Sequence, residues 1–584
     1  SGTMHVGDEV AITIHERFKI LDESALHLAS RKFYYWGSRR MRSFKAQTIN
    51  RDPATGEVRI DEVPKDEVYT VDVSGETRAK SVAFPNVQVG SILEYTYTLE
   101  SEYYTSLEDW VFQDANLPTL YSSLEFHCAD WLYYSILTLG KNLNTKYADA
   151  KENKKWALTN IRSFKDEPFV NNYLDYADQV QFQLTAYKQG RYGELVKVLE
   201  EWDAIARRIR EYYQPYFRKD KEAERLLESL TLPEAQSEKV EAIYKAVQQR
   251  IAWNGRYRVL YDKDIDETLE IGEGNSADIN LFIIQLLREA GIEAHPILIS
   301  TRSSGKVLMS YPIISQFNHV IVAVKNGEGF QLVDGISKDL PLSLLPLEDY
   351  NYYGLLIQDK EATWLTFPEP GAAGVTYLVD LDLTNPEQIT GRIACKYEEY
   401  EAFFGRQAWK EEGMKSLLGE QLETDVLNLR LQNPDVRYLD DPTKAFIVEA
   451  DLYQEENPLF ESEFLYIDPD IMGQFEENPF KSPQRDFPIE LPFPTVKRII
   501  YKLKLPEHLE VEDIPESTSF LLLEGAGQFV TSYRLSDDNL LDIRATQKLN
   551  SAYFKPEQYA ELRTFYQQIT DQMQEMAVFK ARED

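Results

Sequence analysis

Three separated stretches of the chain carry side chains that could perform acyl chemistry. They are the runs 273–292, 316–322 and 330–334, which contain Ser276, His319 and Asp334 in that order. A hydroxyl, an imidazole and a carboxylate are the groups with which serine hydrolases attack an acyl carbon. The separations, 43 residues from Ser276 to His319 and 15 more to Asp334, suit a helix, two or three strands and tight turns.

The pattern of apolar residues predicts the elements that hold these side chains. A helix should begin near Ser276 and end at Gly291, which is a favourable C-cap. Extended runs follow at 294–300, 319–324 and 330–334. Earlier apolar residues at helical spacing predict helices around 195–209, 226–230 and 234–253. Helices followed by antiparallel strands indicate an α+β unit over roughly 190–368.

These stretches resemble the transglutaminase-like superfamily, whose core is a papain-like thiol fold. The matching residues are Glu273-Gly274-Asn275-Ser276-Ala277-Asp278, Leu286-Leu287-Arg288-Glu289-Ala290-Gly291-Ile292, Asn318-His319-Val320 and Leu332-Val333-Asp334. In that family a cysteine opens a buried helix after a Gly-rich turn, and a histidine and an aspartate lie on the next two strands. The resemblance places the nucleophile position at Ser276, the base at His319 and the orienting acid at Asp334.

The chain departs from the family at the nucleophile position, where Ser276 stands instead of cysteine. A cysteine at a helix N-terminus beside an imidazole has a pKa well below about 8.5, so thiolate is present at neutral pH. A serine hydroxyl is not ionised by the helix dipole. It would need His319 to take its proton during attack and a well-formed oxyanion hole. We therefore expect Ser276, His319 and Asp334 to form a relic triad without activity.

Other interpretations of these residues stay open. The alternative function is an active hydrolase or acyl transferase, protease-like or transglutaminase-like, that uses the Ser276–His319–Asp334 triad. Ser276 would also serve well as a helix N-cap, and His319 would fit an apolar core. Asp334 could be a turn residue before Gly335.

The resemblance extends to both ends of the chain. Residues 84–95 and 110–113 resemble domain of unknown function 3857, which often precedes this core in bacterial, mostly exported, proteins. Asn478-Pro479-Phe480, Arg485, Phe493-Pro494 and Leu505-Pro506 resemble the domain that accompanies it at the C-terminus. We therefore expect an exported, periplasmic or cell-surface protein. Because Ser1-Gly2-Thr3-Met4 is no basic-then-apolar leader, we expect that any native export signal has been removed.

Length and composition predict a multidomain α+β protein. The 584 residues exceed what one core can hold, and 36 tyrosines and 28 phenylalanines favour strands. We expect a β-rich N-terminal domain at 1–189, built as an antiparallel sandwich or a bent sheet. The transglutaminase-like α+β core should follow at 190–368. A β-rich domain at 369–495 and C-terminal strands with a terminal helix at 496–584 complete the prediction.

Charge and residue counts exclude several classes of function. The formal net charge is −34, which opposes binding to nucleic acid or to an anionic membrane. No apolar run approaches the ~20 residues of a membrane span. Seven histidines without a close pair or an HExxH motif predict no metal site, and the chain has no P-loop or dinucleotide fingerprint, so we expect no cofactor.

Two minor candidates receive structural interpretations. Cys128 and Cys395 make no disulfide framework, and neither follows a glycine turn into a helix, so neither replaces the missing nucleophile. The aspartates at 262, 264 and 266 approach an EF-hand pattern, but Glu267 stands where that loop needs glycine. We expect a solvated acidic loop there.

The favoured function is a non-catalytic homologue that binds a peptide or a glycan, or acts as a scaffold, at the bacterial cell envelope. The ligand would lie in the old cleft between the helix at Ser276 and the strand at His319. The oligomeric state does not follow from the sequence.

Overall fold

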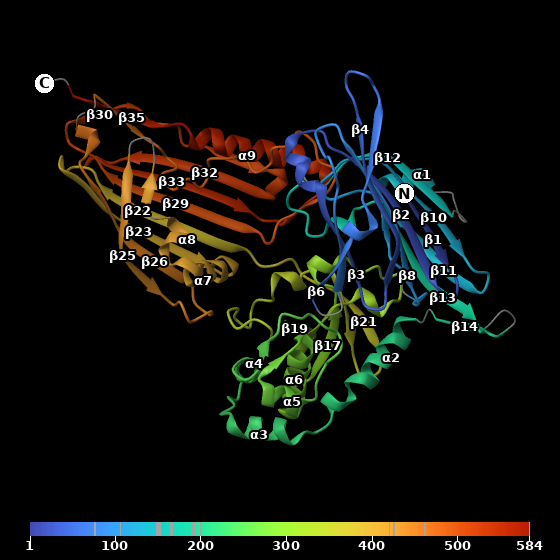
Figure 1. Cartoon of the computed structure of the whole chain (residues 1–584). Helices are drawn as coiled ribbons and strands as arrows, with labels where there is room; N and C mark the ends of the chain where they lie inside the picture. The colour runs from blue at the N-terminus through green and yellow to red at the C-terminus, as the bar shows by residue number, and fades with distance from the viewer. Residues whose placement is uncertain are drawn as a thin grey trace. The chain divides into compact units, whose positions relative to one another are not determined.

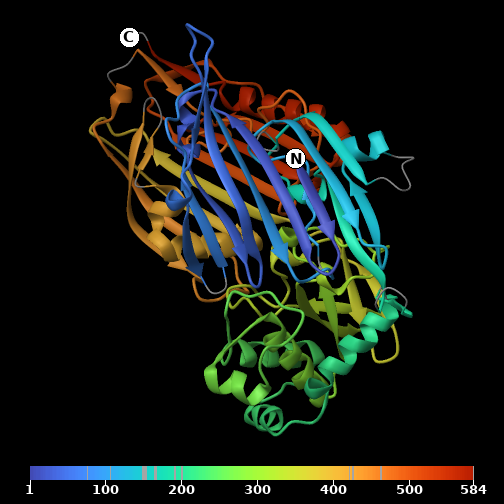
Figure 2. The ribbon, with the colours of Figure 1, turned by 45° about the vertical axis from the view of Figure 1, so that its right-hand side comes forward.

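The computed structural model describes most of the chain as two compact units. The described residues are 1–74, 77–105, 107–147, 154–163, 167–189, 193–198, 201–419, 421–423, 427–460 and 463–582. The first unit comprises 1–166 and 173–201, and the second comprises 167–172 and 202–584. Figures 1 and 2 show the ribbon coloured along the chain.

The first unit is built from strands, as its aromatic content predicts. Its largest sheet has the order β12-β10-β1-β2-β8-β4-β5. These strands are β1 (Gly2–Val6), β2 (Val10–Lys19), β4 (Arg40–Arg51), β5 (Val58–Glu62), β8 (Ile92–Ser101), β10 (Thr119–Cys128) and β12 (Lys155–Ile161). Pairing within it is antiparallel except between β1 and β10. Alternate residues of these strands are buried, and they form two hydrophobic clusters, one with Leu93 and Tyr95 and the other with Leu124.

Two smaller sheets complete the first unit. One has the order β3-β7-β6, from β3 (Ser30–Trp36), β7 (Thr77–Ala83) and β6 (Tyr69–Ser74). The other has the order β11-β13-β14, with β9 paired to β13. Its strands are β9 (Trp110–Val111), β11 (Leu132–Leu139), β13 (Gln179–Lys188) and β14 (Leu195–Lys197), and the helix α1 (Lys141–Tyr147) contacts β11.

The N-terminal part of the second unit places helices against a five-stranded antiparallel sheet of order β19-β18-β17-β20-β21. The strands are β17 (Ala294–Ile299), β18 (His319–Asn326), β19 (Gly329–Val333), β20 (Tyr353–Ile357) and β21 (Ala362–Thr366). The helices, labelled in Figure 1, are α2 (Trp202–Tyr213), α3 (Lys221–Ser229), α4 (Gln236–Gln248), α5 (Ile265–Ile271) and α6 (Ser276–Glu289). Helix α6 packs on β17 and β18, and its residues 276–287 are all buried.

The predicted elements of this part are largely confirmed, with two errors. The helix predicted over 234–253 ends at Gln248, and Ala252–Trp253 form the short strand β15. The helix at Ser276 ends before Gly291, whose φ of +78° is the left-handed conformation expected after a helix. The apolar residues from 195 to 209 do not form one helix. Leu195 lies in β14, whose backbone bonds to β13, and α2 begins only at Trp202. Leu199 lies outside the described residues.

The C-terminal part of the second unit is dominated by a nine-stranded sheet of order β24-β25-β26-β23-β22-β29-β33-β32-β31. Its strands are β22 (Ala373–Asp382), β23 (Gln388–Glu398), β24 (Gln421–Glu423), β25 (Asn428–Arg437), β26 (Phe446–Glu455), β29 (Thr495–Lys504), β31 (Ser519–Leu522), β32 (Gly527–Leu535) and β33 (Leu540–Leu549). Strands β22 and β29 pair in parallel, so strands from both sides of position 495 share this sheet.

Helices and short strands surround this sheet. Two helices, α7 (Tyr400–Glu412) and α8 (Met414–Leu418), are separated at Gly413, whose φ is +67°. The terminal helix is confirmed as α9 (Tyr559–Met573), which contacts β31. The short strands are β27 (Phe464–Ile467), β28 (Ile489–Glu490), β30 (Leu509–Asp513), β34 (Tyr553–Phe554) and β35 (Ala577–Ala581).

The fold class is therefore the predicted one: a multidomain α+β protein with β-rich parts before and after a central α+β core. Among the described residues, no helix has the length and apolar character needed to cross a bilayer.

Candidate functional site

A tight turn and a polar cap set the beginning of helix α6. Asn275 is the N-cap: its side chain accepts hydrogen bonds from the N–H groups of Ala277 (2.8 Å) and Asp278 (3.0 Å). The Asp278 carboxylate accepts in return from the Asn275 N–H at 2.8 Å, which completes a capping box. The N-cap interpretation of Ser276 is therefore wrong. Ser276 is the first helical residue, and its hydroxyl is left for other contacts.

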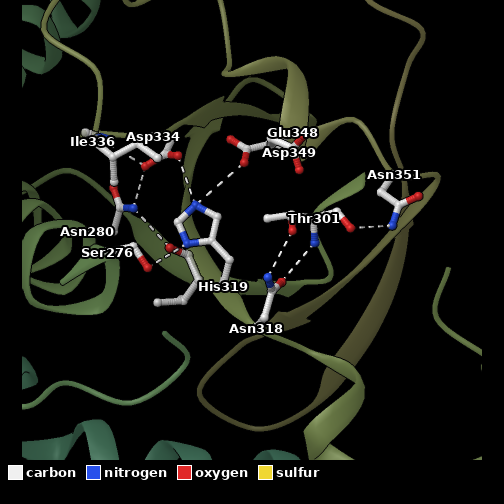
Figure 3. A network of polar contacts seen from close by, with 12 residues as sticks. Ser276, Asn280, Thr301, Asn318, His319, Asp334, Ile336, Glu348, Asp349 and Asn351 are labelled. Atoms are coloured by element: carbon white, nitrogen blue, oxygen red, sulfur yellow. Dashed lines mark hydrogen bonds and ion pairs between the residues drawn. The ribbon is translucent and has the colours of Figure 1, made fainter. Parts of the chain in front are cut away.

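The structure brings the three predicted site residues together (Figure 3). His319, the first residue of β18, has its Nδ1 2.9 Å from the Ser276 Oγ. Its Nε2 lies 2.9 Å from an oxygen of Asp334, which directly follows β19. All three side chains are buried, with Ser276 and His319 wholly inaccessible to solvent. The order hydroxyl, imidazole, carboxylate is that of a catalytic triad.

Asn280 fixes the carboxylate end of this arrangement. It lies one turn after Ser276 on α6, and its Nδ2 donates to Asp334 Oδ1 at 2.6 Å and to the Val320 carbonyl at 3.0 Å. Its Oδ1 accepts from the Gly335 N–H at 2.8 Å. A Cβ on Gly335 would lie 2.4 Å from Ile283 Cδ1 and 2.9 Å from Ile279 Cγ2, so a larger residue would force these side chains to shift. Sequence reasoning missed Asn280, although a polar residue four positions from Ser276 in an apolar helix was the available signal.

A backbone segment before the helix engages Ser276 from the other side. The Ser276 Oγ accepts from the Arg258 N–H at 2.8 Å and lies 3.2 Å from the Arg258 carbonyl. The Ser276 N–H donates to the Arg256 carbonyl at 3.1 Å. The intervening Tyr257 packs edge-on against the His319 ring, with centroids 4.9 Å apart. The side chains of Arg256 and Arg258 are exposed, so their backbone separates Ser276 from solvent.

These contacts limit what the triad can do. A nucleophile at this position must be open to an acyl group, and backbone N–H groups near it would stabilise the oxyanion. Here the Ser276 N–H is already bonded to Arg256, and its hydroxyl has partners on Arg258. The geometry would let His319 receive the Ser276 proton, but the hydroxyl is inaccessible in this conformation.

A second carboxyl group faces His319 and was missed by sequence reasoning. Asp349 lies in the turn Leu347–Asp349, and its Oδ1 is 3.6 Å from His319 Nε2. It is fully buried, and neither oxygen accepts a hydrogen bond from a donor group among the described residues. Burial raises the pKa of Asp349 well above its usual range, and the adjacent Asp334 carboxylate raises it further. No sequence pattern distinguishes this aspartate from the half-buried Glu348 beside it.

The acidic stretch and the two cysteines have structural roles. Asp264 is the N-cap of α5 and accepts from the Glu267 N–H at 2.9 Å. Asp262 donates its N–H to the Asp278 carboxylate at 3.1 Å, so this stretch supports the start of α6. Burial raises the pKa of the Cys128 thiol to about 11 and that of the Cys395 thiol to about 12, which leaves both as neutral thiols at pH 7.

Comparison with known proteins agrees with this architecture. The family model of the transglutaminase-like superfamily matches residues 223–335, which contain the three site residues. Two models described as domains of unknown function with solved structures match the flanks: DUF3857 at 8–165 and DUF3858 at 463–579. A search of curated proteins found no match to the chain.

A solved structure from Parabacteroides distasonis, described as a "putative protease", shares the fold. The two chains superpose with a TM-score of 0.56 and are 11% identical, and the match covers 99% of this chain and 97% of that one. The chain therefore contains a transglutaminase-like core at 223–335, with a DUF3857 match before it and a DUF3858 match after it.

Proposed function

We propose that this protein is a non-catalytic member of its superfamily that acts as a peptide- or glycan-binding or scaffolding module at the bacterial cell envelope. The observation that carries the proposal is the complete engagement of Ser276. Its hydroxyl and N–H both bond to the backbone at 256–258, and the residue has no exposed surface. A nucleophile must reach its substrate, whereas a structural hydroxyl only needs its partners.

The chemistry of serine supports this role. The helix dipole does not ionise a hydroxyl at this position at neutral pH, because the pKa of a hydroxyl is far above that of a thiol. It makes good hydrogen bonds, however, and those to Arg258 and His319 join the segment before α6 to strand β18. Ser276 is therefore suited to a structural role, in which it links these two parts of the core.

An exposed aromatic face supports the binding part of the proposal. Tyr34 and Trp36 on β3 and Tyr69 on β6 are 52%, 51% and 62% exposed. The strand register places them on one face of the three-stranded sheet, because Tyr34 pairs with Ala79, and Tyr69 pairs with Ser81 on the same strand β7. Exposed rings of this kind suit contact with sugars or peptide side chains.

The envelope setting rests on the resemblance of the N-terminal region to domains found mostly in exported bacterial proteins. Because Ser276 and His319 are wholly buried, we place ligand contact on the exposed surfaces and not on the triad itself.

The second candidate function is an active hydrolase or acyl transferase. The observation that favours it is the 2.9 Å separation at both links of the triad, which matches a working nucleophile, base and orienting acid. It requires the segment 256–258 to move away from Ser276 before substrate can bind.

A serine-directed fluorophosphonate probe separates the two functions. The intact chain is incubated with the probe and its mass is measured, beside a known serine hydrolase as positive control. We expect no adduct on the wild-type chain. An adduct that disappears in Ser276→Ala, but persists in the exposed-site control Ser237→Ala, would establish the hydrolase and contradict the proposal.

A further inference from the structure

The buried carboxyl group of Asp349 has no role in the contacts described so far. Asp349 is fully buried, and its two oxygens lack a donor among the described residues. Its backbone N–H is satisfied by the Pro346 carbonyl at 3.0 Å, so only the carboxyl group is unexplained. An ionised carboxylate without a partner is strongly unfavourable in such a place, so a compensating group is expected beside it.

Ordinary cations of the chain do not supply that compensation. The Arg302 guanidinium acts on Asp349 only through space, because its Nε donates to the Tyr350 carbonyl at 2.9 Å and its Nη1 to the Pro492 carbonyl at 3.3 Å. The neighbouring Glu348 adds negative charge, although its carboxylate is bonded to Ser303. Two carboxyl groups and one imidazole thus share a buried space without a bonded cation among the described residues.

Three atoms converge in this space. His319 Nε2 lies 2.9 Å from Asp334 Oδ2 and 3.6 Å from Asp349 Oδ1, and the ligand atoms of the three residues all lie within 4.8 Å of one another. Figure 3 shows both carboxyl groups directed at the same ring nitrogen. Zinc binds imidazole nitrogen and carboxylate oxygen at about 2.0–2.2 Å, so tetrahedral ligands lie roughly 3.3 Å apart. The two observed separations bracket that value.

We propose that His319, Asp334 and Asp349 bind one divalent zinc ion. A doubly charged cation would balance the two carboxylates and give Asp349 its missing partner. The donors come from β18, from the end of β19 and from the turn at 347–349, which explains why no local ligand motif is visible in the sequence. The proposal goes beyond the non-catalytic role, and the two are tested by different readouts.

The surroundings of the three residues suit a bound metal. A histidine that binds zinc through Nε2 carries its proton on Nδ1, and a second partner usually accepts that proton. Ser276 Oγ lies 2.9 Å from Nδ1 and is placed to accept it, while its own proton can go to the Arg258 carbonyl. Asn280 and the Ile336 N–H hold the other oxygen of Asp334 at 2.6 and 3.3 Å. A zinc-bound His319 could not act as a base for Ser276, so the metal and the non-catalytic role are compatible.

Metal analysis of the full-length protein tests the proposal. The protein is stripped of metal with a chelator, reloaded with one equivalent of Zn²⁺ and desalted. Its zinc content per chain is then measured by elemental mass spectrometry. We expect about one zinc per chain in the wild type and in the control Asp339→Asn, whose carboxylate is partly exposed and paired with Lys410. Asp349→Asn should lose at least tenfold in zinc affinity, because loss of an outer-shell partner alone typically costs about tenfold or more and here a direct ligand is removed. Equal uptake by all three proteins, or no uptake by the wild type, would overturn the proposal.

A second measurement covers the case in which Asp349→Asn fails to fold. Zinc-edge X-ray absorption on the loaded wild type should show one imidazole and otherwise oxygen ligands. Sulfur or a second imidazole would place the metal elsewhere and overturn the assignment. If the folded wild type does not bind zinc, the zinc site is wrong. A proton shared by Asp334 and Asp349 would then account for the close approach of the two carboxyl groups. Fluorophosphonate labelling reports on Ser276, whereas zinc content reports on His319, Asp334 and Asp349. Failure of the proposed function and failure of the zinc site can therefore be distinguished.

Discussion

At the scale of single residues, the site is defined by what surrounds one hydroxyl group. Ser276 stands where relatives place a thiol, and the structure gives it two backbone contacts to Arg258 and one ring contact to His319. A thiol forms weaker hydrogen bonds than a hydroxyl, so these contacts suit oxygen better than sulfur. Under the proposed function, serine at this position supplies a structural hydroxyl in place of a reactive thiol.

Replacing Ser276 with alanine should destabilise the second unit. The change leaves the Arg258 N–H and the His319 Nδ1 without their buried partner, which costs about 1–3 kcal/mol in the free energy of unfolding. Urea denaturation followed by tryptophan fluorescence measures the difference. The matched control is Ser237→Ala, which removes an exposed hydroxyl in the first turn of α4.

The opposite result is also informative. Active-site residues are often kept at a cost in stability, and removing one can stabilise the protein. If Ser276→Ala were as stable as Ser237→Ala or more stable, the structural role of the hydroxyl would be wrong.

The residue types of the site could be predicted in part. Ser276, His319 and Asp334 lie in stretches that resemble a known family, and the structure places them within hydrogen-bonding distance of one another. Arg258 could not be predicted, because it acts through its backbone, which any residue provides. Asp349 could not be predicted either, since only the tertiary fold directs it at His319.

At the scale of secondary-structure elements, the beginning of α6 positions the site. The capping box of Asn275 and Asp278 fixes the first turn, and Asn280 then reaches Asp334 from the second turn. Burial raises the pKa of Asp278, although three backbone N–H groups favour its charged form. The cap and the triad are therefore parts of one hydrogen-bonded structure.

Removing this cap should weaken the helix start. Asn275→Ala deletes the acceptor for two backbone N–H groups and should cost about 1–2 kcal/mol. Asn275→Ser retains an acceptor at the cap and should keep most of that stability. The two variants are compared by chemical denaturation. Equal stability of both variants with the wild type would show that the cap does not hold α6.

Periodicity predicted the long buried elements and failed on short ones. Helix α6 and strands β17 and β18 are rich in buried apolar residues, so their positions followed from the sequence. Strand β14 has only three residues and is formed by pairing with β13, which local spacing cannot reveal. Helix α5 is equally short, and its cap Asp264 lies in a run of acidic residues that suggested a loop.

At the scale of the whole molecule, the chain joins a strand-rich first unit to a second unit that holds the site. Within the second unit the β-rich strands after 373 continue across position 495 in a single sheet, because β22 and β29 pair along ten residues each. That pairing links segments more than a hundred residues apart, which local sequence patterns do not encode.

The most direct test of the central claim is amide hydrogen exchange of the intact chain. The claim is that the segment 256–258 closes over Ser276, through the Arg258 N–H to Ser276 Oγ and the Ser276 N–H to Arg256 carbonyl. Mass spectrometry with residue-level fragmentation measures both amides. We predict that they exchange as slowly as the amide of Leu281 within α6. Exchange as fast as that of the exposed Gly255 would show that the segment opens and would contradict the account.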